Sequence, residues 1–174
     1  MRKFTCVLTM IILDLLISFT SFQYAFSLAG TVNPFSDSNA KIESILSQTS
    51  NGKYVVNLQY SPELVGKGEL TFFMANLFND IEGKQIRMRH VDCDFIIEKD
   101  KIELFRLSTK YGEPLIYAIN GVMLASFAFN ETGNYTISIE LAGQYSIPIR
   151  PVFANFSAMV THTSDGNLEV KLST

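Results

Sequence analysis

The side chains with the most varied chemistry occur in one short run, residues 88–94. The run contains the thioether of Met88, the imidazole of His90, the thiol of Cys93 and the carboxylates of Asp92 and Asp94. If the run is one unbroken strand, its side chains alternate between two faces. The even-numbered residues then share one face and Cys93 points to the other. The first face offers thioether, imidazole and carboxylate groups, all of which are copper ligands.

This pattern leads to a metal hypothesis, in which Met88, His90, Asp92 and His162 bind copper. His162 is the second of only two histidines, so it is the one available partner imidazole. Its distance from His90 depends on the order of the strands, which the sequence leaves open. The alternative is a solvated polar face on the strand, with His162 in a loop. Metal sites normally need three or four converging ligands, and this requirement favours the alternative.

Two other types of chemistry are possible in the same run. Cys93 alternates with apolar residues, so we expect a buried and unreactive thiol. Asp92 and Asp94 would lie about 7 Å apart on one face, a spacing that resembles the paired carboxylates of some hydrolases. A solvated acidic edge explains the pair without catalysis. The chain contains no nucleophile elbow, P-loop or dinucleotide-binding glycine pattern, and we therefore expect that it is not an enzyme.

Three Asn-X-Ser/Thr sequons follow, at Asn130, Asn134 and Asn155. We expect each asparagine to be exposed at a strand end or edge, where a sugar could be attached in a secreted chain. Asn130 and Asn134 belong to a predicted turn, which favours them over Asn155 as glycosylation candidates.

Composition limits the classes of function. The chain has 174 residues and a formal net charge of −3, and it has no basic cluster. Nucleic-acid binding depends on cationic contacts to phosphates, so nucleic acid is not an expected partner. The hydrophobic fraction of 47% is too high for intrinsic disorder.

Residues 1–27 are typical of a secretory signal peptide. Arg2 and Lys3 precede an apolar run at 7–22, and Ala25 and Ser27 provide small side chains for a signal peptidase. The alternative is an uncleaved membrane anchor, although Asp14 would be unfavourable near the middle of a spanning helix. We expect a secreted or cell-envelope protein, with membrane contact only through this segment if it is uncleaved.

Residues 28–52 are rich in Ser, Thr and Asn and predict a polar linker. Within it, Ile42, Ile45 and Leu46 recur at helical spacing, which predicts one short helical turn. The folded part is then expected at residues 53–174.

From residue 53 onward, apolar and polar residues alternate with period two, and turn signals recur at intervals of roughly ten residues. Strands are expected at 54–60, 70–78, 85–99, 102–107, 135–141 and 152–160, with a hairpin turn at Asn120 and Gly121. The pattern predicts an all-β fold, an antiparallel immunoglobulin-like sandwich of about eight strands. Tyr135 follows a glycine turn and opens an alternating strand. It is therefore a candidate tyrosine corner, with its hydroxyl bonded back to the turn.

The motifs YSP at 60–62, GKGE at 66–69 and HVDCDFIIEKD at 90–100, together with residues 129–140, give the chain a family likeness. Over residues 53–160 it resembles small secreted immunoglobulin-like domains of archaeal cell envelopes, and more distantly the YtkA/FixH type of sandwich. The resemblance implies an envelope location near copper-handling proteins. Relatives often carry a His-rich segment, and the corresponding residues 108–113 contain no histidine.

Together these observations predict a non-enzymatic binding or accessory module of the cell envelope, whose partners are other envelope or surface proteins. An exposed aromatic patch would mark its binding surface. The alternative function is an envelope copper- or other metal-binding protein that uses His90 and its neighbours.

Overall fold

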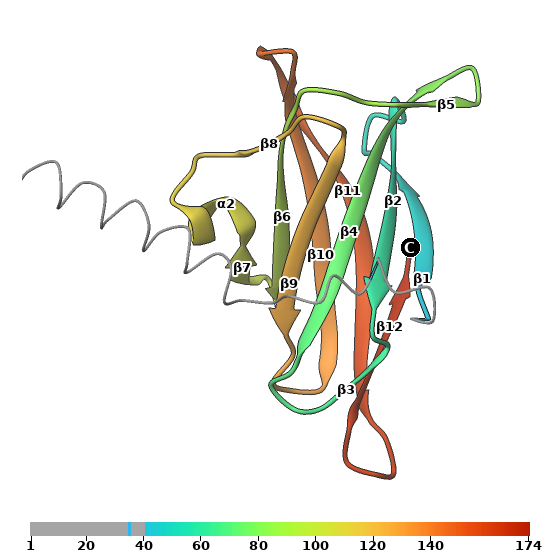
Figure 1. The fold of residues 1–174 in the computed structure, drawn as a ribbon, viewed down its shortest axis with the longest axis vertical. Coiled ribbons are helices and arrows are strands. Elements are labelled where there is room, and N and C mark those ends of the chain that lie inside the picture. Colours follow the sequence, from blue (N-terminus) through green and yellow to red (C-terminus); the bar gives the residue numbers. More distant parts are fainter. Residues whose placement is uncertain (1–34, 36–40) are drawn as a thin grey trace, which may run out of the picture. The chain divides into compact units, whose positions relative to one another are not determined.

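The computed structural model describes Phe35 and residues 41–174. The expected signal peptide, and most of the expected linker before residue 41, lie outside the described residues. In the described part, twelve strands and one short α-helix, α2 (Leu107–Tyr111), form two sheets in which all pairings are antiparallel (Figure 1). The predicted all-β sandwich is confirmed, with twelve strands in place of about eight.

The first sheet has the order β1-β2-β4, and the other edge of β4 pairs first with β9, along residues 70–76, and then with β5, along residues 78–81. Its strands are β1 (Glu43–Gln48), β2 (Tyr54–Ser61), β4 (Leu70–Ile81), β5 (Lys84–Arg87) and β9 (Val122–Ala128). The second sheet has the order β3-β12-β11-β10-β6-β7, with β8 also paired to β6. Its strands are β3 (Leu64–Val65), β6 (Val91–Lys99), β7 (Ile102–Arg106), β8 (Ile116–Ala118), β10 (Gly133–Gln144), β11 (Ile147–His162) and β12 (Leu168–Ser173).

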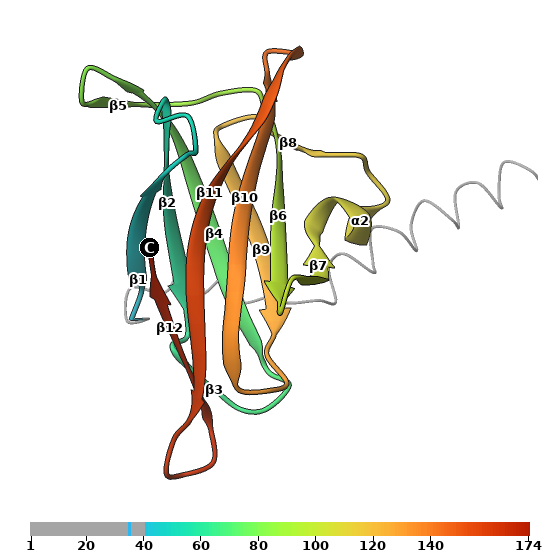
Figure 2. The ribbon, with the colours of Figure 1, turned by 180° about the vertical axis from the view of Figure 1, so that it is seen from behind.

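Six central strands follow the immunoglobulin connectivity. In chain order, β2, β4 and β9 pair in one sheet, and β6, β10 and β11 pair in the other. This is the distribution of strands A, B and E against C, F and G in immunoglobulin sandwiches. Figures 1 and 2 show the two layers from opposite sides.

The core lies between the sheets and is built by alternation along the strands. Every second residue of β10 and of β11 is buried over most of their length, and the largest buried side chains include Phe73, Phe95, Phe129 and Phe156. Phe73 contacts Phe95 and Phe129 with ring centroids 5.2 and 6.4 Å apart. Burial of each such ring stabilises the fold by roughly 2–3 kcal/mol. No helix in the described part of the chain is long and apolar enough to cross a bilayer.

The tyrosine corner is confirmed. Tyr135 is buried near the start of β10, and its hydroxyl donates a 2.8 Å hydrogen bond to the backbone carbonyl of Glu131. Its ring packs edge-on against Phe129, with centroids 5.0 Å apart. This contact and hydrogen bond fix the crossing from β9 to β10, where the chain changes sheets.

The predicted start of the folded part at residue 53 is too late. Residues 43–48, assigned to the linker, form β1, and every residue of β1 pairs with a residue of β2. Ile45 faces the core, whereas Leu46 is exposed on the outer side of the sheet. The helical spacing of these apolar residues is therefore misleading, because one belongs to the inner face and the other to the outer face of an edge strand.

The expected strand at 85–99 is interrupted. β5 ends at Arg87, residues 88–90 cross from one sheet to the other, and β6 begins at Val91. His90 has a positive φ of 52°, which breaks the alternation on which the shared face of Met88 and His90 depended. Met88 consequently lies in the core.

The expected hairpin at Asn120 and Gly121 is also a crossing between sheets. β8 pairs with β6, whereas β9 pairs with β4 in the opposite sheet. Gly121 has φ 63°, and a Cβ atom there would lie 2.3 Å from the carbonyl oxygen of Met88. Glycine is required because two backbone segments approach each other this closely.

Candidate functional site

The connection between β5 and β6 meets the turn between β10 and β11 at one end of the sandwich, and His90 lies at this meeting point. Its backbone N–H donates to the carbonyl of Ile119 (3.0 Å), and its own carbonyl accepts from the N–H of Tyr145 (2.7 Å). Tyr145 and Ser146 both have positive φ and form the two-residue turn of the hairpin. Three segments that are distant in sequence are therefore joined by backbone hydrogen bonds around His90.

The side chains continue this arrangement. Nδ1 of His90 and the hydroxyl of Tyr117 are hydrogen-bonded at 2.7 Å, and the two ring centroids are 5.8 Å apart. The ring of Tyr145 lies on another side of the imidazole, with centroids 5.3 Å apart. A histidine thus connects two tyrosines and limits the motion of the Tyr117 ring.

Despite these contacts, the group faces solvent. Tyr117 is 50% exposed and Tyr145 58%, and the neighbouring Ile119 and Ile147 are 56% and 67% exposed. We call His90 and these four residues the aromatic end patch. Large apolar side chains that cluster at one exposed place are typical of interaction sites, whereas scattered ones are ordinary.

The position of the aromatic end patch matches that of known binding loops. In the immunoglobulin correspondence, the chain from β4 to β6 is the B–C connection and the β10–β11 turn is the F–G loop. In variable domains these two loops lie at the antigen-binding end. The hairpin extends beyond the body of the sandwich (Figure 1), which leaves its tip accessible.

The structure does not bring the proposed copper ligands together. His90 lies beside the turn that precedes β11, whereas His162 is the last residue of β11, sixteen residues in length. At 3.3 Å per residue, the two histidines are separated by roughly 50 Å. Met88 is buried in the core, and no group of three or more His, Cys, Asp or Glu side chains among the described residues could hold a metal ion. The proposed set of Met88, His90, Asp92 and His162 therefore does not converge on one copper site among the described residues.

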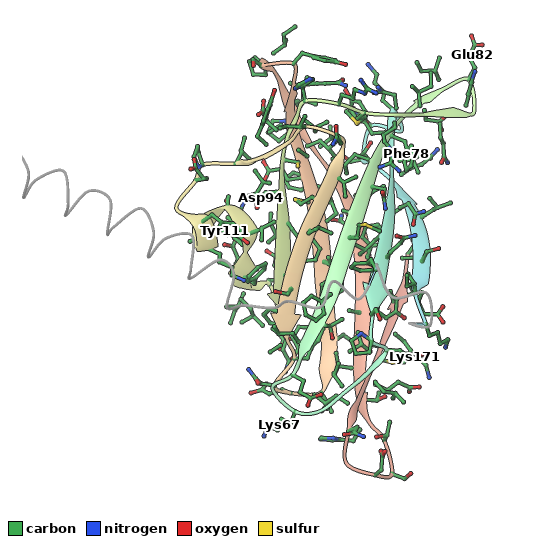
Figure 3. The ribbon with its side chains drawn as sticks, in the orientation of Figure 1. Lys67, Phe78, Glu82, Asp94, Tyr111 and Lys171 are labelled. Atoms are coloured by element: carbon green, nitrogen blue, oxygen red, sulfur yellow. The ribbon has the colours of Figure 1, made fainter. Side chains whose placement is uncertain are left out.

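Asp94 does not belong to a solvated face. It is fully buried where β6 passes α2 (Figure 3), and it accepts hydrogen bonds from the backbone N–H of Ser108 (3.0 Å) and from the Ser108 hydroxyl (2.5 Å). The Arg106 guanidinium forms an ion pair with the Asp94 carboxylate, with an N···O distance of 3.1 Å. It also pairs with Glu103 and Glu140. Hydrogen bonds to Glu103 and Asp94 raise the pKa of the Arg106 guanidinium.

This ion network has a structural role. It attaches the start of α2 to β6 and satisfies a buried carboxylate, which would otherwise be costly to desolvate. Asp92 is half-buried, whereas Asp94 is enclosed by its partners. The two carboxylates therefore do not form a solvent-facing pair of the kind that glycoside hydrolysis needs.

Cys93 is a buried thiol, as predicted. It points into the core beside Met123, with the two sulfur atoms 3.8 Å apart. Burial, followed by the nearby charges of Asp94 and Asp92, raises the pKa of the thiol to about 12. The nucleophilic thiolate is therefore suppressed at neutral pH.

The three sequon asparagines are exposed but differ in setting. Asn130 lies in the loop between β9 and β10, at a hollow of about 340 Å³. Asn134 is the second residue of β10, not part of the turn. Asn155 lies within β11 and not at a strand end, at a position where β11 pairs with β10 and has not yet begun to pair with β12.

No protein-family model matches the chain, and no curated protein matches it.

Sequence reasoning identified His90 but missed both tyrosines of the aromatic end patch. Tyr145 lies outside the expected strands at 135–141 and 152–160, in the turn between β10 and β11. A large aromatic residue at a hairpin turn is a usable signal, because it cannot be buried there. Tyr117 carried no such signal, since its proximity to His90 arises from the pairing of β8 with β6.

Proposed function

We propose that the protein is a non-enzymatic binding module of the cell envelope, and that it contacts a partner protein through the aromatic end patch. The observation that carries the proposal is the exposed group of Tyr117 and Tyr145 on either side of His90. Tyrosine is enriched at protein interfaces because its ring is large, has few rotatable bonds and ends in a hydrogen-bonding hydroxyl.

Preorganisation supports the same role. The backbone bonds of His90 to Ile119 and Tyr145, and its side-chain bond to Tyr117, hold the patch before any partner arrives. A partner then has less side-chain and loop motion to restrain, which favours affinity. Catalysis is not part of the proposal, because the buried titratable groups Cys93 and Asp94 are enclosed by the core or by ion partners.

The envelope location rests on the sequence. Residues 1–27 are typical of a secretory signal peptide, and the motifs of residues 53–160 resemble envelope immunoglobulin-like domains. The partner is accordingly expected among other surface or envelope proteins.

Site-specific photocrosslinking in the native envelope tests the proposal. A benzophenone amino acid replaces Tyr145 in one variant of the full chain and Tyr111 in another. Tyr111 is the matched control, since it is 62% exposed at the end of α2 and does not belong to the aromatic end patch. We expect a discrete adduct from position 145 only, and we expect Tyr117→Ala in the same chain to reduce its yield.

Equal adducts from both positions, or none from position 145 while position 111 reacts, would refute the patch as the contact surface. Growth and fractionation of cells that carry the chain test the location separately. Recovery of the protein in the cytosol with residues 1–27 intact would contradict the envelope assignment.

A further inference from the structure

The three sequons lie in different backbone environments, and this difference decides which can be modified after folding. We propose that Asn130 is the acceptor for an N-linked glycan on the folded domain, whereas Asn134 and Asn155 are acceptors only before folding. In the cell, this proposal depends on the extracytoplasmic location given above, because N-glycans are added outside the cytosol.

The sequon at Asn130 is free of both sheets. β9 ends at Ala128 and β10 begins at Gly133, and residues 130–132 are all exposed between them. The carboxylate of Glu131 pairs with Lys99, and its backbone carbonyl accepts a hydrogen bond from the hydroxyl of Tyr135. The Asn130 amide and the Thr132 hydroxyl, the two groups a transferase must recognise, form no hydrogen bond within the described part of the chain.

The space beside Asn130 fits a sugar. The asparagine lines the hollow of about 340 Å³ together with Leu104, Phe127 and Tyr135. Leu104 is half exposed, and Lys99 and Glu131 stand at the same hollow. Apolar side chains beside charged groups suit a sugar ring, whose faces carry C–H groups and whose edges carry hydroxyls.

The sequon at Asn134 enters the sheet at once. Tyr135 pairs with both Lys99 of β6 and Ala158 of β11, and its side chain is buried. Thr136 is likewise paired on both sides. An enzyme that surrounds this sequon must first detach β10 from both neighbours, an opening that approaches global unfolding in free energy.

The sequon at Asn155 is constrained in the same way. Asn155 accepts a hydrogen bond from the Ser138 hydroxyl through its amide oxygen (2.9 Å), and Phe156 is buried in the core. Ser157 pairs with Thr136 on one side and with Ser173 on the other. Exposure of the Asn155 side chain is therefore not sufficient for modification.

The transfer needs a lipid-linked oligosaccharide pyrophosphate as donor. Nδ2 of Asn130 forms a bond to C1 of the first sugar, and the bond from C1 to the pyrophosphate oxygen breaks. The pyrophosphate leaves with the bonding electron pair, and the amide loses one proton. No oxidant or reductant takes part.

Asn130 and the aromatic end patch lie at opposite ends of β10, since Asn130 precedes Gly133 and Tyr145 follows Gln144. Twelve residues of strand separate them by roughly 40 Å. A glycan on Asn130 would therefore leave the patch uncovered.

Reconstitution with purified components tests the proposal. The folded full chain, in mild detergent, is incubated with an oligosaccharyltransferase that accepts Asn-X-Ser/Thr and with a lipid-linked oligosaccharide. Peptide mass spectrometry then measures occupancy at each asparagine. We expect Asn130 to be modified, with occupancy at Asn134 and Asn155 lower by about tenfold or more. Synthetic peptides that cover each sequon should all be modified.

Two variants complete the design. N130Q and T132A should each abolish modification of the folded chain, whereas N155Q should leave it unchanged. Modification of Asn134 or Asn155 in the folded chain at the rate of Asn130 would overturn the proposal, as would an unmodified Asn130 in the folded chain or in its peptide. Because no cell is involved, such a result would count against the acceptor and leave the binding role of the aromatic end patch untouched.

Discussion

At the scale of single residues, Tyr135 shows how one hydroxyl stabilises a crossing between sheets. The hydroxyl of the buried Tyr135 side chain donates a hydrogen bond to the carbonyl of Glu131. Loss of the hydroxyl leaves this carbonyl without that donor. We expect Tyr135→Phe to lower the free energy of unfolding by about 1 kcal/mol. Urea denaturation measures the change, with Tyr111→Phe as an exposed control that should have no effect. Equal effects of the two substitutions would mean that the corner bond contributes nothing.

Cys93 leads to a prediction about pH. The folded thiol keeps its proton up to about pH 12, whereas the unfolded thiol loses it near pH 9. Between these values the native state binds more protons, so its free energy of unfolding must fall as pH rises. We expect the difference in stability between wild type and Cys93→Ala to shrink above pH 9, by about 1 kcal/mol per pH unit.

Urea denaturation at pH 8, 9 and 10, with a reducing agent present, follows this difference. Other groups that titrate in the same range cancel between the two proteins. A difference that stays constant from pH 8 to pH 10 would show that the Cys93 thiol does not titrate differently in the two states.

At the scale of elements, Gly121 supports the crossing from β8 to β9. A methyl group there meets the Met88 carbonyl at 2.3 Å, in addition to the strain of a positive φ. Gly83 also has a positive φ, but open space surrounds its missing side chain. We expect Gly83→Ala to cost about 1 kcal/mol and Gly121→Ala about 3 kcal/mol or more. Thermal and urea unfolding compare them, and similar losses would mean that the close approach is readily relieved.

Periodicity predicted the strands that have one buried face. β2, β4 and β10 follow their expected alternation, as does the apolar face of β6 with Cys93 on it. β7 forms as a strand but has no buried face, because Ile102 and Leu104 are exposed. Failures occur at the edge strand β1 and where the chain changes sheets. The residue types around Met88 and Gly121 do not indicate whether the next strand pairs with the preceding one or crosses to the other sheet. That choice depends on strands that are distant in sequence.

The candidate site was predictable only in part for the same reason. His90 stood out by its type, but its neighbours Tyr117 and Tyr145 come from 27 and 55 residues further along the chain. Tertiary pairing of β6 with β8 and β10 creates their proximity. Asp94 was misplaced because its buried partners, Ser108 and Arg106, belong to a helix and a strand end that the alternation pattern does not describe.

At the scale of the whole molecule, the separation of the two histidines leads to a prediction about metal. A native-state ligand present at a hundred times its dissociation constant stabilises by about 2.7 kcal/mol, which raises Tm by several degrees. Since His90 packs on the turn before β11 and His162 is the last residue of β11, we expect Cu²⁺ to leave the Tm unchanged. Calorimetry with and without Cu²⁺ checks this, and a rise that His90→Ala removes would restore a copper role for His90.

The hairpin that carries Tyr145 has one further property. Between Ile147 and Val152, β11 pairs only with β10, so its other margin is open to water. Pro148 and Pro151 fall in this stretch and have no N–H to donate. A foreign strand that aligned there would lack hydrogen-bond donors at two positions, which disfavours sheet pairing between copies of the protein at this hairpin. A partner that binds at this turn is therefore expected to contact its side chains and not to add a strand to its sheet.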